Sequence, residues 1–415
     1  MTLYIESLYS TIGCNIPSSF LLPPSSFKGS KGFPKLVSSF PVHLHKSFIF
    51  NSLEPERCRV NMKDEARKAH EEGIVVDGLA AVYPKDFDED YFNNVKKAGV
   101  AAIHVTIPDV ECFSMSQAVH ELAVWFRKLR DLEPGKMKLV TAVKEIRKAK
   151  DEGAVAVILG SQAAGFLGLD LRNLDFFMKL GMRTMQPTYQ QRNQFGSGCG
   201  EKNDTGLSNL GIQWVEEMNN VGMVISLSHA GYKTSIEVME VSKDPVIFDH
   251  SNPKNLCNHI RNITDDQIKM CAEKGGVIGL CPLSMFVSTE KRPTELGVDD
   301  YVNHIEYVVN LVGADHVGIG LDHSENDFET PEKILEERRM FPGLTSKFIQ
   351  EIEDEYLKSG RDKLYSYELY TPWLKSVSEM HIITRAMLDR GFSNQDVRKI
   401  LGENFLRVFE RVWGS

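Results

Sequence analysis

Eight short apolar runs alternate with amphipathic segments from residue 73 onward, and this alternation constrains the fold more than any other feature of the sequence. Most of the runs are rich in Val and Ile, and each is four to eight residues long. They cover residues 73–77, 100–107, 155–159, 183–187, 223–227, 245–248, 277–280 and 317–321. Runs of this length and composition are typical of strands that are buried on both faces.

Segments of helical length separate these runs, and their apolar residues recur at spacings of three and four. The clearest cover residues 90–98, 116–132, 209–220, 236–241, 265–274 and 299–312. Apolar strands that alternate with helices indicate a parallel sheet covered by helices. Eight such units over about 250 residues predict an α/β fold of the closed (β/α)8 TIM-barrel type. Because the run at 183–187 is polar and is compatible with a loop, an open doubly wound sheet remains the structural alternative.

The first 61 residues differ from the rest of the chain in composition. They are rich in Ser, Pro and Phe, and Glu6 is the only acidic residue before Glu54. This composition suits an organelle transit peptide, and the alternatives are a disordered extension or a true start at Met62. We expect the barrel to span 62–415, with a charged helical insertion at about 326–366 and a docking helix at 394–413. The expected location is cytoplasmic, or plastid or mitochondrial if the first segment is a transit peptide.

Overall composition excludes several other classes of protein. The 415 residues carry a formal charge of −9 without a basic stripe, which argues against a nucleic-acid partner. No apolar run approaches the roughly 20 residues of a membrane-spanning helix. Seven scattered cysteines without a Cys-x-x-Cys pair favour reduced thiols.

Groups that can bind metal or move protons follow three of the predicted strands. His229 and His250 follow the fifth and sixth runs, and Asp322 follows the eighth. The carboxyl ends of barrel strands meet in one mouth, so these side chains are candidates for one site. Imidazole suits zinc, and Asp322 is suited to bind the ion or to act as a general base. The alternative for each histidine alone is a structural, hydrogen-bonded role.

Arg261 and the loop after the fourth run are candidates for substrate binding. A guanidinium group matches the geometry of a carboxylate, so Arg261 is a plausible carboxylate site. Residues 262–266 are equally suited to begin the next helix. Tyr189 and Asn193 lie on a polar, aromatic loop that fits substrate contact, although such loops are often merely solvated.

Several motifs, in order over residues 73–413, resemble the membrane (renal) dipeptidase family, peptidase family M19, a branch of the amidohydrolase-type barrels. They are Leu180-Gly181-Met182-Arg183, Gly206-Leu207-Ser208 with Gly211, Leu227-Ser228-His229, Pro245-Val246-Ile247-Phe248-x-His250-Ser251, His259-x-Arg261-Asn262-x-x-Asp265-Asp266, Asp315-His316-Val317-Gly318-Ile319-Gly320-x-Asp322 and Gly402-x-Asn404-Phe405-Leu406-Arg407-Val408. As the resemblance implies, His229 and His250 match zinc ligands, Arg261 matches the carboxylate-binding residue, and Asp322 matches the acid/base residue. Family members often form dimers, so a homodimer is also implied.

The resemblance also shows where this chain departs from the family. Family enzymes hold two zinc ions, one on a His-x-Asp pair after the first strand, with a bridging Glu after the third strand. Here Leu79 and Ala81 occupy the positions of the His and the Asp, and Gln162 that of the bridging Glu. Tyr189 stands where the family has a substrate-contacting His. Neighbouring dications repel, and a neutral amide cannot offset this as a carboxylate does.

We therefore predict no binuclear centre and at most one Zn²⁺ or similar ion, held by His229 and His250. Gln162, Asp322 or water are the candidates to complete its coordination. The predicted function is hydrolysis of a small amide or peptide-like metabolite whose carboxylate meets Arg261, with Asp322 passing a proton to the leaving amine. One alternative is non-hydrolytic chemistry of specialised metabolism, such as a lyase, isomerase or condensation step in which Tyr189 acts with these groups. The other is an inactive homologue that binds small carboxylates.

Overall fold

The computed structural model describes the larger part of the chain. The described residues are 66–108, 114–132, 135–325 and 371–414, with short pieces at 328–329, 335, 347–360 and 364–365. The chain divides into two units, Met1–Glu54 and Pro55–Ser415, and every described residue belongs to the second. The predicted extension at 1–61 and its transit peptide therefore lie outside the described residues.

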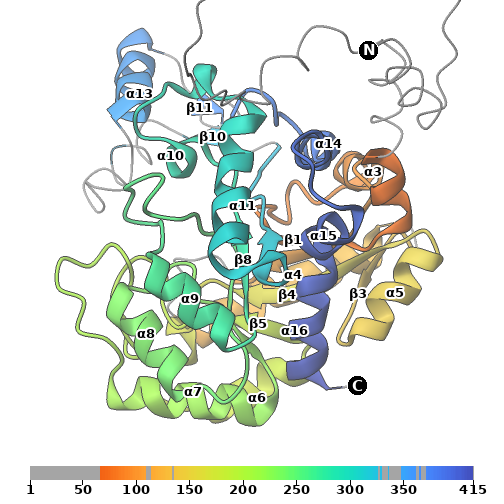
Figure 1. Ribbon diagram of the computed structural model, residues 1–415. Coiled ribbons are helices and arrows are strands. Elements are labelled where there is room, and N and C mark those ends of the chain that lie inside the picture. The colour runs from red at the N-terminus through yellow and green to blue at the C-terminus, as the bar shows by residue number, and fades with distance from the viewer. Residues whose placement is uncertain are drawn as a thin grey trace, which may run out of the picture. The chain divides into compact units, whose positions relative to one another are not determined.

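Parallel strands form the centre of the fold (Figure 1). They are β1 (Val75–Ala80), β2 (Val100–Thr106), β4 (Val155–Ser161), β5 (Met182–Met185), β6 (Val224–Ile225), β7 (Ile247–Phe248), β8 (Val277–Leu280) and β9 (Val317–Ile319). All eight predicted runs contain a strand, including the polar run at 183–187, which forms β5. A short further strand, β3 (Met137–Leu139), pairs with the first half of β4.

The pairing of these strands closes a barrel. One sheet has the order β1-β2-β4-β5-β6, and a second has the order β7-β8-β9. A parallel bridge between Ser226 and Ile247 joins β6 to β7. At the other seam, the amide of Asp322, just beyond β9, donates to the carbonyl of Leu79 on β1 at 2.8 Å. The predicted (β/α)8 barrel is confirmed, and the open doubly wound alternative is wrong.

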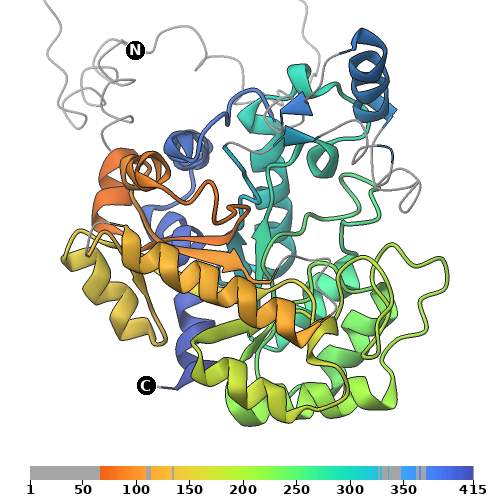
Figure 2. The same ribbon diagram turned by 180° about the vertical axis from the view of Figure 1, so that it is seen from behind.

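Helices follow the strands and cover the outside of the barrel. Between β1 and β9 they are α3 (Glu89–Lys97), α4 (Met115–Asp131), α5 (Val143–Asp151), α6 (Arg172–Lys179), α7 (Asn209–Val221), α8 (Tyr232–Val241), α9 (Asp265–Glu273), the short α10 (Ser284–Val287) and α11 (Val298–Val312). Figure 1 shows α7, α8 and α9 side by side in green, and Figure 2 shows the long α4 in orange across the opposite side. Each of the six predicted helical segments is found within a few residues of its expected bounds.

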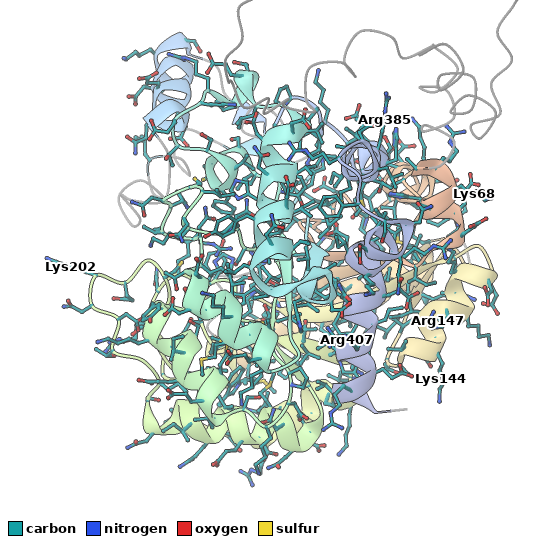
Figure 3. All side chains as sticks on the ribbon, viewed as in Figure 1. Lys68, Lys144, Arg147, Lys202, Arg385 and Arg407 are labelled. Carbon is teal, nitrogen blue, oxygen red and sulfur yellow. The ribbon has the colours of Figure 1, made fainter. Side chains whose placement is uncertain are left out.

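Local sequence explains where these helices begin and which face they bury. Ser208 caps α7 by accepting a hydrogen bond from the amide of Gly211 at 3.0 Å. On α5, Val143 and Ile146 are buried against the barrel, whereas Lys144 and Arg147 point away from the strands (Figure 3). The spacing of three between the buried residues is the helical period that the sequence showed.

The C-terminal segment 394–413 forms two helices rather than the single predicted one. They are α15 (Asn394–Arg398) and α16 (Asn404–Trp413), joined by a wider turn at Lys399–Glu403. At Gly402 the chain passes so close to β1 that a β-carbon would collide with the carbonyl oxygen of Ile74. This close approach interrupts the helix. The predicted apolar face is nevertheless buried along both pieces.

Phe405 of α16 fills the barrel interior next to strands that present glycine. Its ring is fully buried and lies where β-carbons at Gly78 and Gly318 would collide with it and where a β-carbon at Gly279 would be in tight contact with it. These glycines stand on β1, β8 and β9. Gly279 and Gly320 also leave room for the main chain of Asp249, whose carbonyl oxygen faces both. These positions therefore require glycine because a β-carbon has no room there, and not because the backbone φ angle is positive.

After β9 the described pieces include α13 (Lys347–Ser359) and the antiparallel pair β10 (Phe328–Glu329) and β11 (Leu364–Tyr365). They fall within the predicted insertion at 326–366, whose bounds stay a prediction because most of its other residues are not described. Helix α14 (His381–Asp389) leads from there to α15. Within the residues that the structure describes, none of the helices has the length and apolar character that crossing a membrane requires.

The packing of Phe405 predicts a large effect of truncation. Phe405→Ala removes a fully buried ring and leaves a cavity, so we expect the free energy of unfolding to fall by about 3–5 kcal/mol. Phe176→Ala, at a phenylalanine on α6 that is 41% exposed, is the control and should cost less than about 1 kcal/mol. Urea unfolding followed by circular dichroism measures both. Equal losses for the two variants would contradict this account of the core.

Candidate active site

Two histidines meet at the carboxyl ends of neighbouring strands. His229 follows β6 and His250 follows β7. Their Nε2 atoms are 2.9 Å apart, and both side chains are buried. The structure thus brings together the two residues that the sequence placed at adjacent strand ends.

Asp249, the residue before His250, holds the ring of His250 from behind. Its Oδ1 lies 2.7 Å from Nδ1 of His250 and accepts a hydrogen bond from the hydroxyl of Ser228 at 2.6 Å. Gln186 donates to the same oxygen at 3.3 Å. Burial alone would raise the pKa of Asp249, but the adjacent His250 and its hydrogen bond outweigh burial and lower that pKa. Asp249 is therefore ionised and can only accept hydrogen bonds.

His104 of β2 lies on the other side of Asp249. Its Nδ1 is 3.8 Å from Oδ2 of Asp249 and donates to the carbonyl of Gly78 at 2.7 Å. Its Nε2 accepts a hydrogen bond from the hydroxyl of Thr184. Burial lowers the pKa of His104, so the ring is neutral. Gly160 packs against this bond, and a β-carbon there would collide with both side chains.

These hydrogen bonds determine which nitrogen of each histidine carries a proton. Because ionised Asp249 only accepts, Nδ1 of His250 carries a proton and donates it to this hydrogen bond. Burial, followed by the charges of Arg261 and His250, lowers the pKa of His229 well below its ordinary value, so this ring is neutral. Among the described residues, Nδ1 of His229 has no hydrogen-bond partner. The Nε2 atoms of the pair therefore converge on one position, suited to a shared proton or to a cation.

A single metal ion fits this pair of histidines. Imidazole nitrogens bind zinc at about 2.0–2.1 Å, so two nitrogens 2.9 Å apart need little movement to share one ion. The part of the chain that the structure describes has no group of three His, Cys, Asp or Glu side chains placed to hold a metal. Leu79 is buried and, like Ala81, has no ligand atom. Gln162, whose amide nitrogen donates to Thr106 at 3.0 Å, stays a predicted ligand.

Arg261 is a buried cation beside the histidines. Its guanidinium group donates to the main-chain carbonyls of Ser228 and His250, and its Nη2 lies 3.3 Å from Nε2 of His229. It also lies over the ring of Phe286, 5.2 Å from the ring centre. None of these partners carries a full negative charge. A ligand carboxylate would supply the opposite charge that a buried guanidinium favours.

Arg261 also lines a cavity of about 260 Å³ between the loops that follow β5, β6 and β7. Lys254 adds a second cation to its wall, and Cys199 and Ser228 add small polar groups. The first turns of α8 and α9 contribute Tyr232 and Gln267. Glu201 and Asp204 also line the cavity, so its wall carries charges of both signs, with Arg261 on the side of the histidines.

The loop after β5 places Tyr189 and Asn193 differently. The ring of Tyr189 is stacked on His229, with 4.0 Å between ring centres and 28° between ring planes. Asn193 uses its amide within the loop, where it donates to Pro187 at 2.7 Å and accepts from Phe195 at 2.8 Å. Tyr189 is thus part of the histidine cluster, whereas substrate contact by Asn193 stays a prediction.

Asp322 and Asp77 lie at the seam between β9 and β1. Asp322 has a φ of 48°, which costs a residue other than glycine roughly 1 kcal/mol or more, so surrounding contacts must hold it there. Burial raises its pKa, although His250 and Arg261 oppose the shift. Oδ1 of Asp77 accepts hydrogen bonds from the amides of Leu321 at 2.8 Å and Leu79 at 3.2 Å. Burial raises the pKa of Asp77 to about 8.

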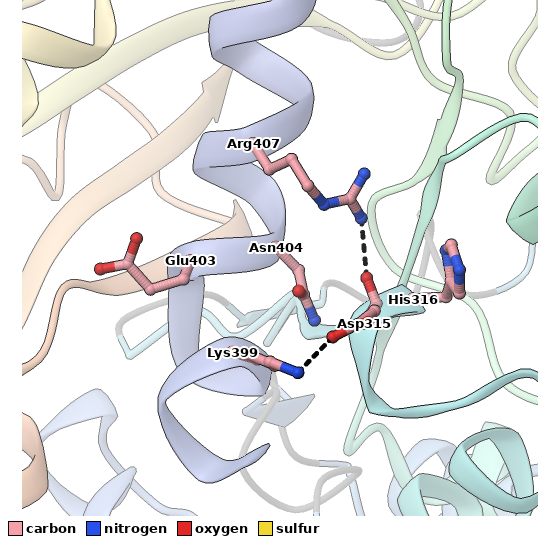
Figure 4. Close-up of a pocket in the computed structure, with 6 residues that line it drawn as sticks. All are labelled: Asp315, His316, Lys399, Glu403, Asn404 and Arg407. Carbon is pink, nitrogen blue, oxygen red and sulfur yellow. Dashed lines mark hydrogen bonds and ion pairs between the residues drawn. The ribbon is translucent and has the colours of Figure 1, made fainter. Parts of the chain in front are cut away.

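A second hollow, of about 510 Å³, lies at the amino end of β9 (Figure 4). Lys399 forms an ion pair with Asp315 at 2.5 Å, and Arg407 donates to the carbonyls of Gly275 and Asp315. These contacts attach the C-terminal helices to the barrel. The reacting groups of (β/α)8 enzymes stand at the opposite, carboxyl face, so this hollow is structural.

Sequence reasoning missed Asp249 and His104, which lie at the centre of the cluster. His104 is a polar residue within an otherwise apolar run, and Asp249 directly precedes a candidate ligand. A polar side chain in a strand buried on both faces requires a partner. The presence of His104 in such a run was therefore the feature of the sequence that pointed to a buried polar partner.

A family model and a solved structure each match most of this chain. Residues 64–359 match the family model described as "Membrane dipeptidase (Peptidase family M19)". An amidohydrolase from Pseudomonas aeruginosa is 31% identical, and the similarity covers 84% of this chain and 99% of that one, with a TM-score of 0.72.

Two curated relatives are matched over a smaller share of their length. Dipeptidase tcpJ of Claviceps purpurea is 26% identical over 321 residues, which are 75% of this chain and 65% of that protein. An uncharacterised dipeptidase of Schizosaccharomyces pombe is 31% identical over 207 residues, or 48% and 49% of the two chains. This chain thus spans less than two thirds of either of these two relatives.

The raised pKa of Asp77 predicts a pH dependence of stability. The unfolded chain releases this proton near pH 4, whereas the folded chain retains it up to about pH 8. The contribution of Asp77 to stability is therefore fully present below pH 4 and is lost as the pH rises through 8. Asp77→Asn can still accept both amide hydrogen bonds but does not titrate. Urea unfolding from pH 4 to 8 should show wild type losing stability relative to Asp77→Asn, and parallel curves would contradict this.

Proposed function

Because the chain belongs to the membrane dipeptidase family (peptidase family M19), we propose that it hydrolyses a small amide or peptide-like substrate that carries a free carboxylate. The observation that carries the proposal is the pair of Nε2 atoms of His229 and His250, which face each other at 2.9 Å. One divalent ion, of the kind that the family's metallopeptidases use, fits between them. The site lies at the carboxyl face of the barrel, where such enzymes act.

Each nearby residue has a role that its surroundings support. Arg261 binds the substrate carboxylate, because the oxygens that accept its hydrogen bonds are the uncharged main-chain carbonyls of Ser228 and His250. Tyr189 covers one face of His229 and keeps water from that side of the ring. Asp322 accepts the proton that the attacking water loses as its oxygen bonds to the substrate carbonyl carbon, and it passes that proton to the leaving amine as the C–N bond breaks. Burial raises the pKa of Asp322, which helps it to hold the proton between these two events. A bound metal supplies an activated water at neutral pH.

The donor set supports one ion rather than two. Two imidazoles can hold one ion, and its further coordination positions are then open to water, substrate or Asp322. At the place of a second ion the chain presents Leu79 and Ala81, which have no ligand atoms. Gln162 cannot neutralise two dications as a bridging carboxylate does. We therefore infer a mononuclear centre.

A second candidate function is metal-independent binding of small carboxylates. It is favoured by the buried guanidinium group of Arg261 at the wall of a cavity that also presents Lys254. This feature does not require an ion between the histidines. The two candidates differ in their dependence on metal.

Replacing either histidine tests the metal-dependent proposal. We expect His229→Ala and His250→Ala each to lower bound zinc from about one ion per chain to near zero, and dipeptide hydrolysis more than about 100-fold. Mass spectrometry of metal content after equilibration with zinc measures the first, and chromatography of the products measures the second. His316→Ala, in the structural hollow, is the matched control. Turnover that persists in wild type after a chelator is added, and that persists in both histidine variants, would reject the proposal. Ligand binding without turnover would favour the second candidate.

Arg261→Lys tests recognition of the carboxylate. Lysine keeps the positive charge but loses the paired geometry of guanidinium, so we expect KM for an unblocked dipeptide to rise about 10-fold or more. The same dipeptide with a C-terminal amide lacks the carboxylate, and its KM should change little. A similar rise for both substrates would show that Arg261 supports the site only structurally.

A further inference from the structure

We propose that Asp249 is the positioning residue of the metal site, because it fixes the His250 ring with its Nε2 lone pair directed at His229. This inference rests on the proposed function. It concerns a residue that neither the sequence patterns nor the comparisons single out. It follows from the contacts of one buried carboxylate.

The carboxylate of Asp249 is held from several sides, so its position is fixed before any ligand arrives. Ser228 donates to Oδ1 at 2.6 Å, and its own oxygen accepts the amide of His250 at 3.0 Å. Gln186 donates to both carboxylate oxygens, at 3.3 and 3.4 Å. The main chain of Asp249 lies in the space left by Gly279 and Gly320. A side chain with this many constraints orients its partner rather than adapting to it.

The hydrogen bond from His250 has a direct consequence for metal binding. A neutral imidazole has one protonated and one unprotonated nitrogen, and only the unprotonated one binds metal. Oδ1 of Asp249 accepts a hydrogen bond from Nδ1, 2.7 Å away, and so keeps the proton of the ring on Nδ1. Nε2 is then left without a proton and can bind the ion. Carboxylate–histidine–metal arrangements of this kind raise the basicity of the ligand.

Asp249→Ala tests the orientation of His250 independently of metal. One oxygen, Oδ1 of Asp249, accepts from both Ser228 and Nδ1 of His250, so an asparagine oxygen in that place would keep both bonds, whereas alanine removes the acceptor. We expect Nδ1 to lose its proton and Nε2 to gain it. Long-range ¹⁵N–¹H spectra of histidine-labelled, metal-free protein distinguish the two forms, with His250→Gln used to assign the signal. A variant that retains the proton on Nδ1 would overturn the proposal.

Metal affinity provides the second readout. Asp249→Ala should weaken binding of Zn²⁺ or Co²⁺ about 10- to 100-fold, measured by titration calorimetry and by the visible spectrum of cobalt. Asp265→Ala is the matched control, because that carboxylate bonds Tyr307 away from the histidines. Unchanged affinity in a folded Asp249→Ala chain would overturn the role of Asp249. If wild type binds neither ion, the mononuclear proposal fails, whereas the histidine spectra still decide whether Asp249 orients His250.

Discussion

Space inside the barrel is the constraint on which the rest of the structure depends. Strands β1, β8 and β9 present Gly78, Gly279 and Gly318 where other barrels have larger side chains. The space is filled from below by Phe405 and from above by the main chain of Asp249. The hydrophobic core and the site are therefore packed against the same glycines of these strands. The helix that plugs the barrel supports the same strands that carry the reacting groups.

This arrangement explains why the site is rigid on one side. Asp249 is placed by main-chain packing, Ser228 by its two hydrogen bonds, and His250 by both. On the opposite side, Asp322 has a backbone angle that only surrounding contacts maintain. The proton transfer proposed for Asp322 requires a fixed position of this residue, and the hydrogen bond from its amide to Leu79 across the β9–β1 seam holds its main chain.

The sequence was sufficient for the architecture because the barrel depends on patterns that repeat. Even the polar run that forms β5 has the burial of a barrel strand, since Met182, Thr184 and Met185 are buried and only Arg183 is partly exposed. The helix break at Gly402 could not be predicted, because its cause is the carbonyl of Ile74, more than three hundred residues away. The same is true of His104 and Asp249. Their pairing depends on the spatial order of β2 and β7 across the barrel, which no local pattern contains.

Charge balance around the histidines gives a further argument for one ion. Asp249 and Arg261 are both buried and both contact His250, and they contribute one formal negative and one formal positive charge. A dication adds two positive charges, which one substrate carboxylate and an ionised Asp322 together neutralise. A second dication would require two further negative charges, and the positions next to it hold Leu79, Ala81 and Gln162. Since an unbalanced buried charge is strongly unfavourable, the loss of carboxylates on one side of the site and the presence of Asp249 on the other are parts of the same electrostatic arrangement.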